Sequence, residues 1–476
     1  MGVIDGRQVL CHGAFALAVG AVGAAASVVL CLVVNGAFGL LGRFPALLMG
    51  LPLFALASLA LYRRHGVPLN TTTRSVARRI REDEVISPWL APDILVGTAL
   101  SILGGASVGK EAGALHMGAS LGQLVARPFH LRSVYRSDAA CGKDRTGMSA
   151  YAASAGMAAA FSALFFAPLG SAAFVMELTG YRREVVRHLP TLLLGCAVAW
   201  AGASLTGVGD VIPKVALPAV TWRVAGACVL VGAVAGVAGG LFGSAIDHVQ
   251  RATEHIRRNY CLWAVAGSAL FVALVLGAGW QAFEGTGAVQ LAEALAGRAG
   301  AWDFAVKALL TLLCLGFWLR GGEIMPTFTV GALLGVSCTT MTGGDAGVSA
   351  ALGLVAFFCA MSRCPLAAFL MGCEIFGWEG APLFALAVAT AYLVRRGEGY
   401  YALGATSMMR DALGRRRQRH RSAGRPAAQG EGRNAASEAA GSRRSARLVD
   451  DATRLVRTKA AEVEEELETH GDDAVK

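Results

Sequence analysis

GKEAGALHMGASLG, from Gly109 to Gly122, is repeated in outline by GEIMPTFTVGALLG, from Gly322 to Gly335. In both stretches glycine stands at the first, tenth and fourteenth positions. Each stretch opens on a glycine-rich break and continues as an apolar segment that is short for a membrane span, which needs about 20 residues. Backbone that breaks inside a membrane is tolerated where it is buried in protein or lines a cavity. The repeated break therefore predicts a helix that begins inside the protein.

A second pair of stretches repeats further along the chain. PLGSAAFVMELTG begins at Pro168 and PLAAFLMGCEIFG at Pro365, and Glu177 and Glu374 stand equally far behind these prolines. Two ordered matches predict two similar halves, which we place at about residues 13–206 and 221–408. Transporters built from such repeats bind their substrates near the bilayer midplane, where the repeats meet.

The composition indicates an all-helical, multi-pass membrane protein. Hydrophobic residues make up 55% of the 476 residues and charged residues 16%, and the 60 glycines are typical of closely packed membrane helices. The clearest spans are 13–42, 44–62, 221–246 and 261–279, and shorter or broken stretches are 91–107, 116–125 and 326–342. The cysteines are scattered without a CxxC pair or a histidine at metal-ligand spacing, so we expect no metal site. We also expect no cofactor and no enzymatic activity.

The net charge of +10 comes from short segments between helices and from the tail, so we do not expect nucleic-acid binding. Arginines cluster at 63–81 and at 415–421, which the positive-inside rule places in the cytoplasm. We therefore expect both termini to be cytoplasmic. We expect the membrane to be a plasma membrane, namely a bacterial inner membrane. The charged tail, 409–476, is either largely disordered or contains a short amphipathic helix from about Leu448 to Leu467.

The two breaks suit an anion. A helix N-terminus presents unpaired N–H groups and the positive end of the helix dipole, and two such termini can face a common site. Glu111 stands at the first of them, where its carboxylate can take the place of a permeating anion and release it on protonation. We therefore predict that Glu111 is both gate and proton carrier, with a simple helix cap as the alternative.

The second break carries a different acid. Glu323 aligns with Lys110, and a buried carboxyl group beside an anion is expected to be protonated and to donate a hydrogen bond. Fluoride suits such a donor best, since it is the smallest halide and the strongest hydrogen-bond acceptor. The alternative is an ion pair between Glu323 and Arg320. We expect Glu177 and Glu374 to be structural, and His116 to be a packed, hydrogen-bonded side chain.

These residues resemble the CLC family of chloride channels and proton-coupled halide antiporters, over about residues 10–408. GKEAG at Gly109 is similar to the family motif GREGP, with Glu111 in the place of the gating glutamate. GGEIMP at Gly321 is similar to GGxFxP, and Tyr401 takes the place of the tyrosine that contacts the central anion. The segment from Ala155 to Leu178 is similar to the family segment that ends in two glutamates.

Departures from the family pattern point to the substrate. The chloride-type loop GSGIP is represented only by His65, Gly66, Val67 and Pro68, without its serine. Glu323 and Ile324 resemble the fluoride/proton antiporter subclade, whereas Met325 is less typical of it. Leu178 replaces the second glutamate, which argues against ordinary chloride/proton exchange.

The resemblance implies a CLC-type fold of two inverted repeats with broken helices, and a homodimer with one pathway per subunit. The leading hypothesis is fluoride export driven by protons, and the alternatives are a chloride channel, a chloride/proton antiporter, or a membrane sensor that no longer transports. The residues expected around the anion are His65, Gly66, Gly109, Lys110, Gly322, Glu323, Ile324, Met325 and Tyr401.

Overall fold

The computed structural model describes residues 5–133, 147–209, 212–255, 259–395 and 399–401. The chain divides into two units, 1–408 and 409–476. The second unit lies outside the described residues, and so does the amphipathic helix expected in it. The described residues form helices joined by short connections and contain no β-strand beyond one isolated bridge.

The first repeat consists of nine helices among the described residues. They are α1 (Gly6–Arg43), α2 (Leu51–Arg64), α3 (Thr73–Arg81), α4 (Leu90–Leu103), α5 (Glu111–Ala126), α7 (Met148–Phe165), α8 (Pro168–Thr179), α9 (Arg183–Arg187) and α10 (Leu189–Thr206), with short 3-10 turns at Pro45–Gly50 and Arg127–Phe129.

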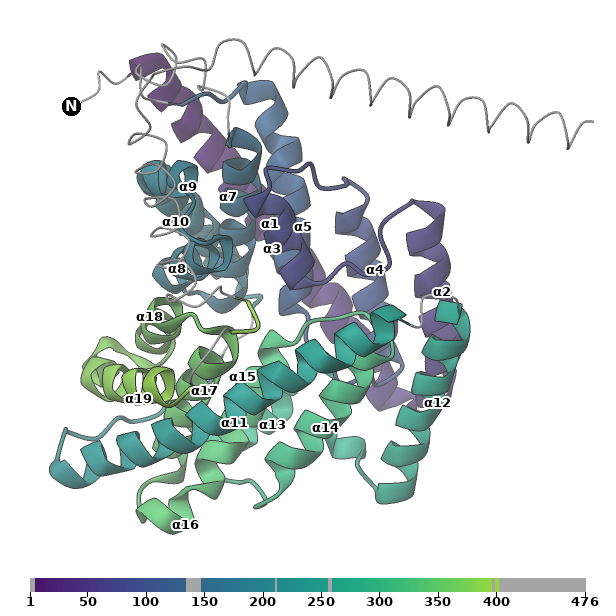
Figure 1. Cartoon of the computed structure of the whole chain (residues 1–476), viewed down its shortest axis with the longest axis vertical. Helices are drawn as coiled ribbons and strands as arrows, with labels where there is room; N and C mark the ends of the chain where they lie inside the picture. The colour runs from purple at the N-terminus through teal and green to yellow at the C-terminus, as the bar shows by residue number, and fades with distance from the viewer. Residues whose placement is uncertain (1–4, 134–146, 210–211, 256–258, 396–398, 402–476) are drawn as a thin grey trace, which may run out of the picture. The chain divides into compact units, whose positions relative to one another are not determined.

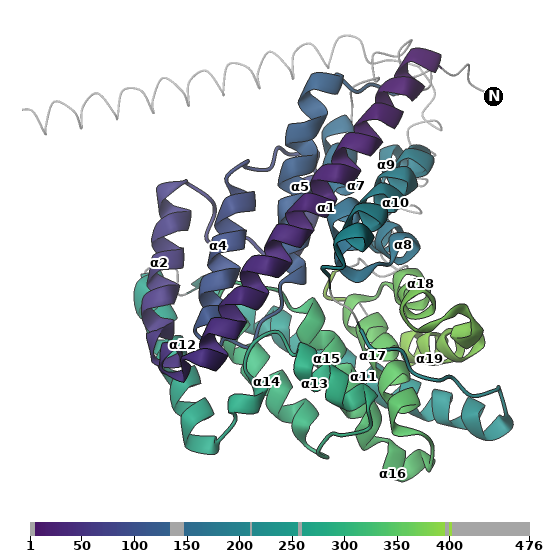
Figure 2. The same ribbon diagram turned by 180° about the vertical axis from the view of Figure 1, so that it is seen from behind.

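The second repeat follows in the same order. Its helices are α11 (Trp222–His255), α12 (Tyr260–Ala278), α13 (Ala288–Leu295), α14 (Asp303–Gly316), α15 (Ile324–Ser337), α16 (Thr339–Thr342), α17 (Ala346–Ser362), α18 (Pro365–Phe376) and α19 (Ala381–Val394), with 3-10 turns at Gln281–Phe283 and Trp378–Gly380. The long helix α11 runs across the front of the molecule in Figure 1, and its counterpart α1 runs across the front after the half-turn of Figure 2. The two repeats therefore present their first helices on opposite faces.

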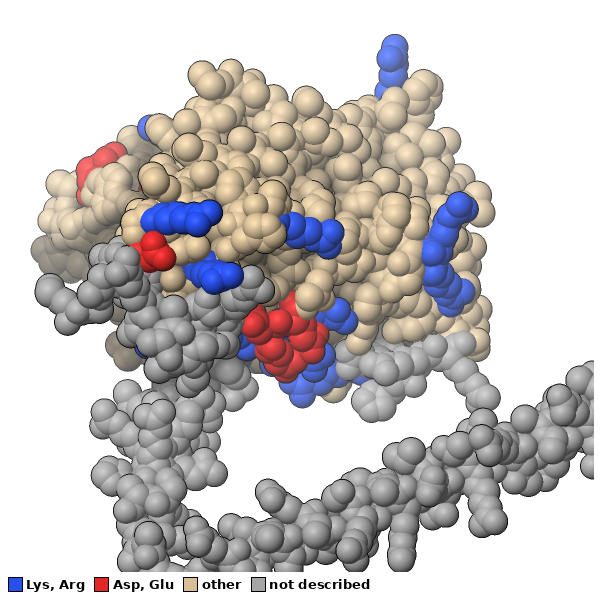
Figure 3. Space-filling model, turned by 90° about the horizontal axis from the view of Figure 1, so that it is seen from above, with Lys and Arg blue, Asp and Glu red and all other residues tan. Residues whose placement is uncertain are grey.

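Six helical segments of the described chain are long and apolar enough to cross a membrane. They are Gly6–Arg43, Pro45–Arg64, Met148–Phe165, Leu189–Thr206, Trp222–Ala252 and Tyr260–Ala278. The sequence predicts four of these and misses α7 and α10. Helix α7 is rich in alanine and almost wholly buried, so its hydropathy is lower than that of a lipid-facing helix. On the face shown in Figure 3, charged side chains are sparse and uncharged surface dominates.

The broken helices are short, as the repeated glycines predict. Helix α5 has 16 residues and α15 has 14, which at about 1.5 Å per residue gives roughly 24 and 21 Å, less than the hydrocarbon core of about 30 Å. Each packs against another helix of its own repeat: α5 packs against α7, and α15 packs against α17.

Glycines allow these helix pairs to approach closely. A Cβ atom on Gly118 would lie 2.3 Å from the carbonyl oxygen of Gly156, and one on Gly156 would lie 2.0 Å from that of Gly118. The same reciprocal contact joins Gly331 to Gly353 in the second repeat, at 2.7 and 2.3 Å. The glycine spacing in the sequence thus records a backbone-to-backbone contact that both repeats share.

We expect Gly156→Ala to destabilise the protein, because a methyl group there meets backbone that cannot turn aside. Overpacking of this kind costs about 1–3 kcal/mol. The measurement is the thermal unfolding midpoint of the detergent-solubilised protein. Gly36→Ala in α1, where a Cβ meets nothing within 4 Å, is the control and should leave the midpoint unchanged or raised. Equal midpoints for the two variants would contradict the packing argument.

Candidate anion site

The breaks of the two repeats meet in a single backbone bridge. The N–H of Gly109 donates to the carbonyl of Gly322 at 2.6 Å, and the N–H of Gly322 donates to the carbonyl of Gly109 at 2.6 Å. Helix α5 begins two residues after Gly109 and α15 begins two residues after Gly322. The N-termini of the two short helices are therefore held beside each other at one point, as the sequence predicts.

The carboxylate of Glu111 lies at the N-terminus of the other repeat's helix. Its Oε2 accepts a hydrogen bond from the backbone N–H of Met325 at 3.1 Å, and the residue is fully buried. Met325 is the second residue of α15, so this N–H is one of those that lack a partner within the helix. A helix N-terminus stabilises negative charge, and Glu111 places its carboxylate where an anion would bind.

Glu323 and Tyr401 form the second part of the site. The Tyr401 hydroxyl donates a hydrogen bond to Oε1 of Glu323, and both residues are buried. The neighbouring Tyr400 instead donates to Gln250 at 2.7 Å, so only one of the two tyrosines contacts an acid. Arg320 forms no ion pair with Glu323 within the described chain.

The guanidinium group of Arg320 has other partners. It donates to the carbonyl oxygens of Leu69 and Thr71, the latter at 2.9 Å. It also lies over the rings of Trp318 and Tyr62, 3.9 and 4.6 Å from their centroids. The predicted alternative, in which Arg320 neutralises Glu323, is therefore not what the structure shows.

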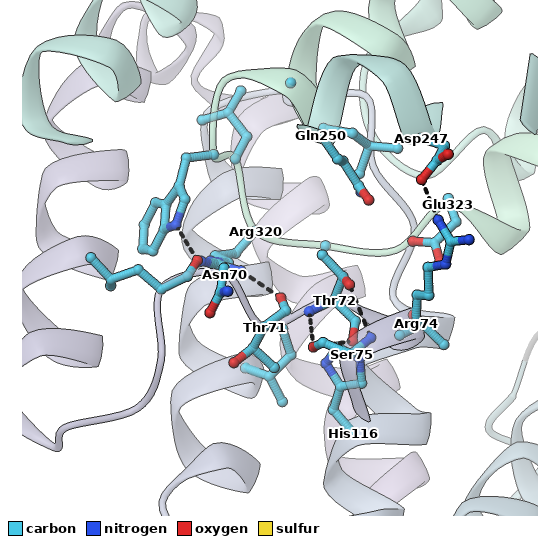
Figure 4. Close-up of a pocket in the computed structure, with 18 of the residues that line it drawn as sticks. Asn70, Thr71, Thr72, Arg74, Ser75, His116, Asp247, Gln250, Arg320 and Glu323 are labelled. Atoms are coloured by element: carbon cyan, nitrogen blue, oxygen red, sulfur yellow. Dashed lines mark hydrogen bonds and ion pairs between the residues drawn. The ribbon is translucent and has the colours of Figure 1, made fainter. Parts of the chain in front are cut away.

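A cavity of about 310 Å³ opens beside Glu323, and we call it the arginine cavity. It is lined by the connection 69–72, by residues of α3, α4, α5, α11 and α12, by the end of α14 and by the connection that follows it to Glu323; Figure 4 shows the lining. Its charged lining residues are Arg74, Arg78, Arg81, Arg251, Arg320, Asp247 and Glu323. Asp247 is bound by both Arg74 and Arg251. The excess of arginine makes this cavity attractive to anions.

The structure does not bring His65 and Gly66 to the arginine cavity. His65 hydrogen-bonds through Nδ1 to Asp93 at 2.6 Å and stacks on Trp89, with ring centroids 4.3 Å apart. The connection that reaches the cavity begins later, at Leu69, and leads into α3. The loop predicted to contact the anion, at the end of α2, therefore does not line this cavity, and its contact with an anion stays a prediction.

Sequence reasoning missed this connection, although a local signal marks it. Thr72 caps α3 by accepting from the N–H of Ser75 at 3.2 Å, and Ser75 Oγ accepts from the N–H of Thr72 at 2.8 Å. The run of three threonines before a basic helix is typical of a helix start. This signal marks Thr72 as the residue that caps α3, beside the cavity.

The remaining predicted residues have varied positions. Lys110 is buried and donates through Nζ to Asn35 of α1 at 3.0 Å. Ile324 and Met325 are buried in the first turn of α15, and Met325 contributes its backbone N–H rather than its side chain. The described residues contain no group of three or more His, Cys, Asp or Glu that could hold a metal ion.

Glu177 and Glu374 cap each other's helices. The Glu177 carboxylate on α8 accepts from the backbone N–H groups of Leu366 and Ala367 of α18, at 3.2 and 2.9 Å. The Glu374 carboxylate on α18 accepts from those of Leu169 and Gly170 of α8, at 2.9 and 2.7 Å. The two helices therefore run in opposite directions and exchange caps, a geometry that supports the structural role expected for both acids.

We expect Glu177→Gln to lower the thermal unfolding midpoint while anion flux is retained. Glutamine loses the charge that strengthens both hydrogen bonds, which are worth about 1.5–3 kcal/mol each when one partner is charged. Glu379→Gln, at an exposed acid, is the control and should unfold like the wild type. A loss of flux in Glu177→Gln without a loss of stability would show that the acid belongs to the transport path.

Together, two inverted repeats, two helix N-termini joined by a backbone bridge and a carboxylate lodged at one of them define a membrane transporter of the two-repeat class. A family model described as "Voltage gated chloride channel" matches residues 53–396. The chain belongs to this CLC family and is of the type that transports halides.

Relatives and solved structures agree with this assignment. A protein of Pseudomonas syringae pv. tomato, named "Chloride/fluoride channel protein", is 30% identical over 369 residues, 74% of this chain and 76% of the relative. The crystal structure of a CLC-type fluoride/proton antiporter superposes with a TM-score of 0.74 at 22% identity, covering 84% of this chain and 98% of that one. A slow cyanobacterial Cl⁻/H⁺ antiporter superposes with a TM-score of 0.69 at 17% identity, covering 86% and 99%. At such identities the structural likeness shows the fold.

Proposed function

We propose that this protein exports fluoride from the cytoplasm in exchange for protons. The observation that carries the proposal is the second acid of the site, Glu323, buried at the arginine cavity with Tyr401 donating to one of its oxygens. A protonated Glu323 has its own O–H to donate to a passing anion. A compact, strongly accepting anion gains most from such a donor, and this favours fluoride over chloride.

Proton coupling in the proposal follows from the position of Glu111. Its carboxylate accepts a hydrogen bond from an N–H group of α15 that a bound anion would also need. The anion and the carboxylate therefore compete for one helix terminus. Protonation removes the charge of Glu111 and with it the main reason for the carboxylate to stay there. One residue thus links the arrival of a proton to the admission of an anion. A relative named a chloride/fluoride channel protein and a fluoride/proton antiporter with the same fold support this choice.

Assembly and placement belong to the same proposal. We take the functional unit to be a homodimer with one pathway per subunit, in a bacterial inner membrane, with both termini and the arginine cavity toward the cytoplasm. Neither a cofactor nor an enzymatic step is part of it. One copy per detergent particle by light scattering would contradict the dimer. Labelling of a cysteine introduced into the tail by an impermeant reagent added to intact cells would contradict the orientation.

The test of the transported ion is a flux measurement on the purified protein in liposomes. We expect an ion-selective electrode to record fluoride efflux faster than chloride efflux by about tenfold or more, a preference of about 1.4 kcal/mol, with an internal pH dye recording proton uptake. Equal fluxes of the two halides would support the chloride alternatives instead. Absence of both fluxes would support the sensor.

For the mechanism, we expect Glu111→Gln to abolish fluoride-driven proton uptake, because the glutamine side chain does not ionise and so cannot bind and release a proton. Fluoride efflux is recorded on the same liposomes, so that loss of coupling is separated from loss of transport. The exposed variant Glu379→Gln should behave as the wild type. Proton uptake that persists in Glu111→Gln at the wild-type ratio to fluoride would remove Glu111 from the role of carrier.

A further inference from the structure

One polar side chain in the wall of the arginine cavity has no described function. His116 lies on α5, is 2% exposed, and lines the cavity together with Glu323 and Arg320. Figure 4 shows its ring rising from α5 toward Thr72 and Ser75 at the start of α3. Neither ring nitrogen has a hydrogen-bond partner among the described residues. The packed, hydrogen-bonded histidine expected from the sequence is therefore buried as predicted but lacks the predicted hydrogen bond.

The polar groups around the His116 ring are occupied by each other. Thr72 and Ser75 exchange hydrogen bonds, since the N–H of each is donated to the hydroxyl oxygen of the other and Ser75 Oγ also donates to the carbonyl of Thr72 at 2.8 Å. Arg320 interacts electrostatically with His116, but its N–H groups are donated to Leu69 and Thr71. Among the described residues, the partner of the imidazole is thus not another protein group.

A neutral imidazole has one N–H donor and one acceptor nitrogen, and leaving a buried polar group unpaired costs about 1–3 kcal/mol. The cavity beside the ring, at about 310 Å³, has room for mobile occupants, and both ring nitrogens are themselves buried behind its wall. Water is one such occupant and the transported anion is the other. The neighbouring arginines favour the anion, because they raise the concentration of anions in the cavity.

We propose that the His116 N–H donates a hydrogen bond to the transported anion while the anion occupies the arginine cavity. The identity of that anion as fluoride rests on the proposed function above, whereas the role of the histidine does not. His116 then acts as a neutral donor among cationic arginines, and it orients the anion on the side of the cavity that faces α5. A neutral donor binds a halide without the strong attraction of a full charge, so the anion is not trapped.

The experiment compares two substitutions at this position. His116→Leu removes the donor, and His116→Gln keeps an N–H donor of similar reach. Fluoride efflux from liposomes is measured over a range of fluoride concentrations, and fluoride binding to the detergent-solubilised protein is measured by calorimetry. We expect His116→Leu to raise KM and the dissociation constant by about two- to tenfold, the effect of one neutral hydrogen bond, and His116→Gln to stay near the wild type.

A control on the same helix separates this effect from general damage to α5. Ser120 is also buried, but it donates to the carbonyl of Ser87 at 2.9 Å and does not line the arginine cavity. Ser120→Ala should therefore leave KM unchanged. A wild-type KM in His116→Gln is the second control. Damage to the fold alone would raise KM in both variants, whether or not the new side chain has a hydrogen-bond donor.

Two results would overturn the inference. Wild-type KM and binding in His116→Leu would mean that the ring is satisfied by water alone. Equal impairment of the leucine and glutamine variants would mean that the ring's shape matters and its N–H does not. If the wild type proves to carry chloride rather than fluoride, the proposed function fails, and the same series run with chloride still tests His116.

Discussion

The site depends on two hydrogen bonds between the backbones of Gly109 and Gly322. They hold the breaks of the two repeats together, so that two short helices begin at a common point. Side chains have no room at this bridge, since a Cβ on Gly322 would lie 2.7 Å from the backbone nitrogen of Ala112. Without the bridge the N–H and carbonyl groups of Gly109 and Gly322, next to the helix N-termini, would be unpaired polar backbone in an apolar environment, which is costly. With it, the same termini form a rigid place for negative charge.

The sequence reveals this arrangement where contacts are periodic. Glycines at fixed spacing on α5 and α15 report a helix surface that must meet another backbone, and both repeats keep the pattern because both use the same contact. Glu111 drew attention because an acid at the start of a short helix expected inside the membrane either caps that helix or lies on an ion pathway. Neither inference required knowledge of which helix lies opposite.

The connection between α2 and α3 shows where sequence reasoning ends. Its path depends on the length of α2 and on the turn at Gly66, and neither follows from a repeated pattern. The resemblance led to His65, which is instead held by Asp93 outside the cavity. The partners of Arg320 were equally hidden, because they are carbonyl oxygens of that same connection. Backbone acceptors leave no trace in the side-chain sequence, so buried arginines are poorly assigned from sequence alone.

The two pairs of repeated positions differ in how far they keep the symmetry of the repeats. Both repeats have an acid at the positions of Glu177 and Glu374, and each carboxylate caps the helix of the other repeat. This contact is therefore symmetric. The anion site lacks this symmetry. Glu111 begins α5 and reaches the N–H of Met325, whereas the matching position at the start of α15 is the apolar Ile324.

The acid of the second repeat stands one residue earlier, at Glu323, and contacts Tyr401 instead of the opposite helix. One helix terminus is thus occupied by the carboxylate of Glu111, and no carboxylate from the second repeat is seen in the described structure to occupy the other. We infer that the reciprocal acids Glu177 and Glu374 hold the repeats together, and that Glu111, which has no counterpart at the start of α15, exchanges its place with an anion.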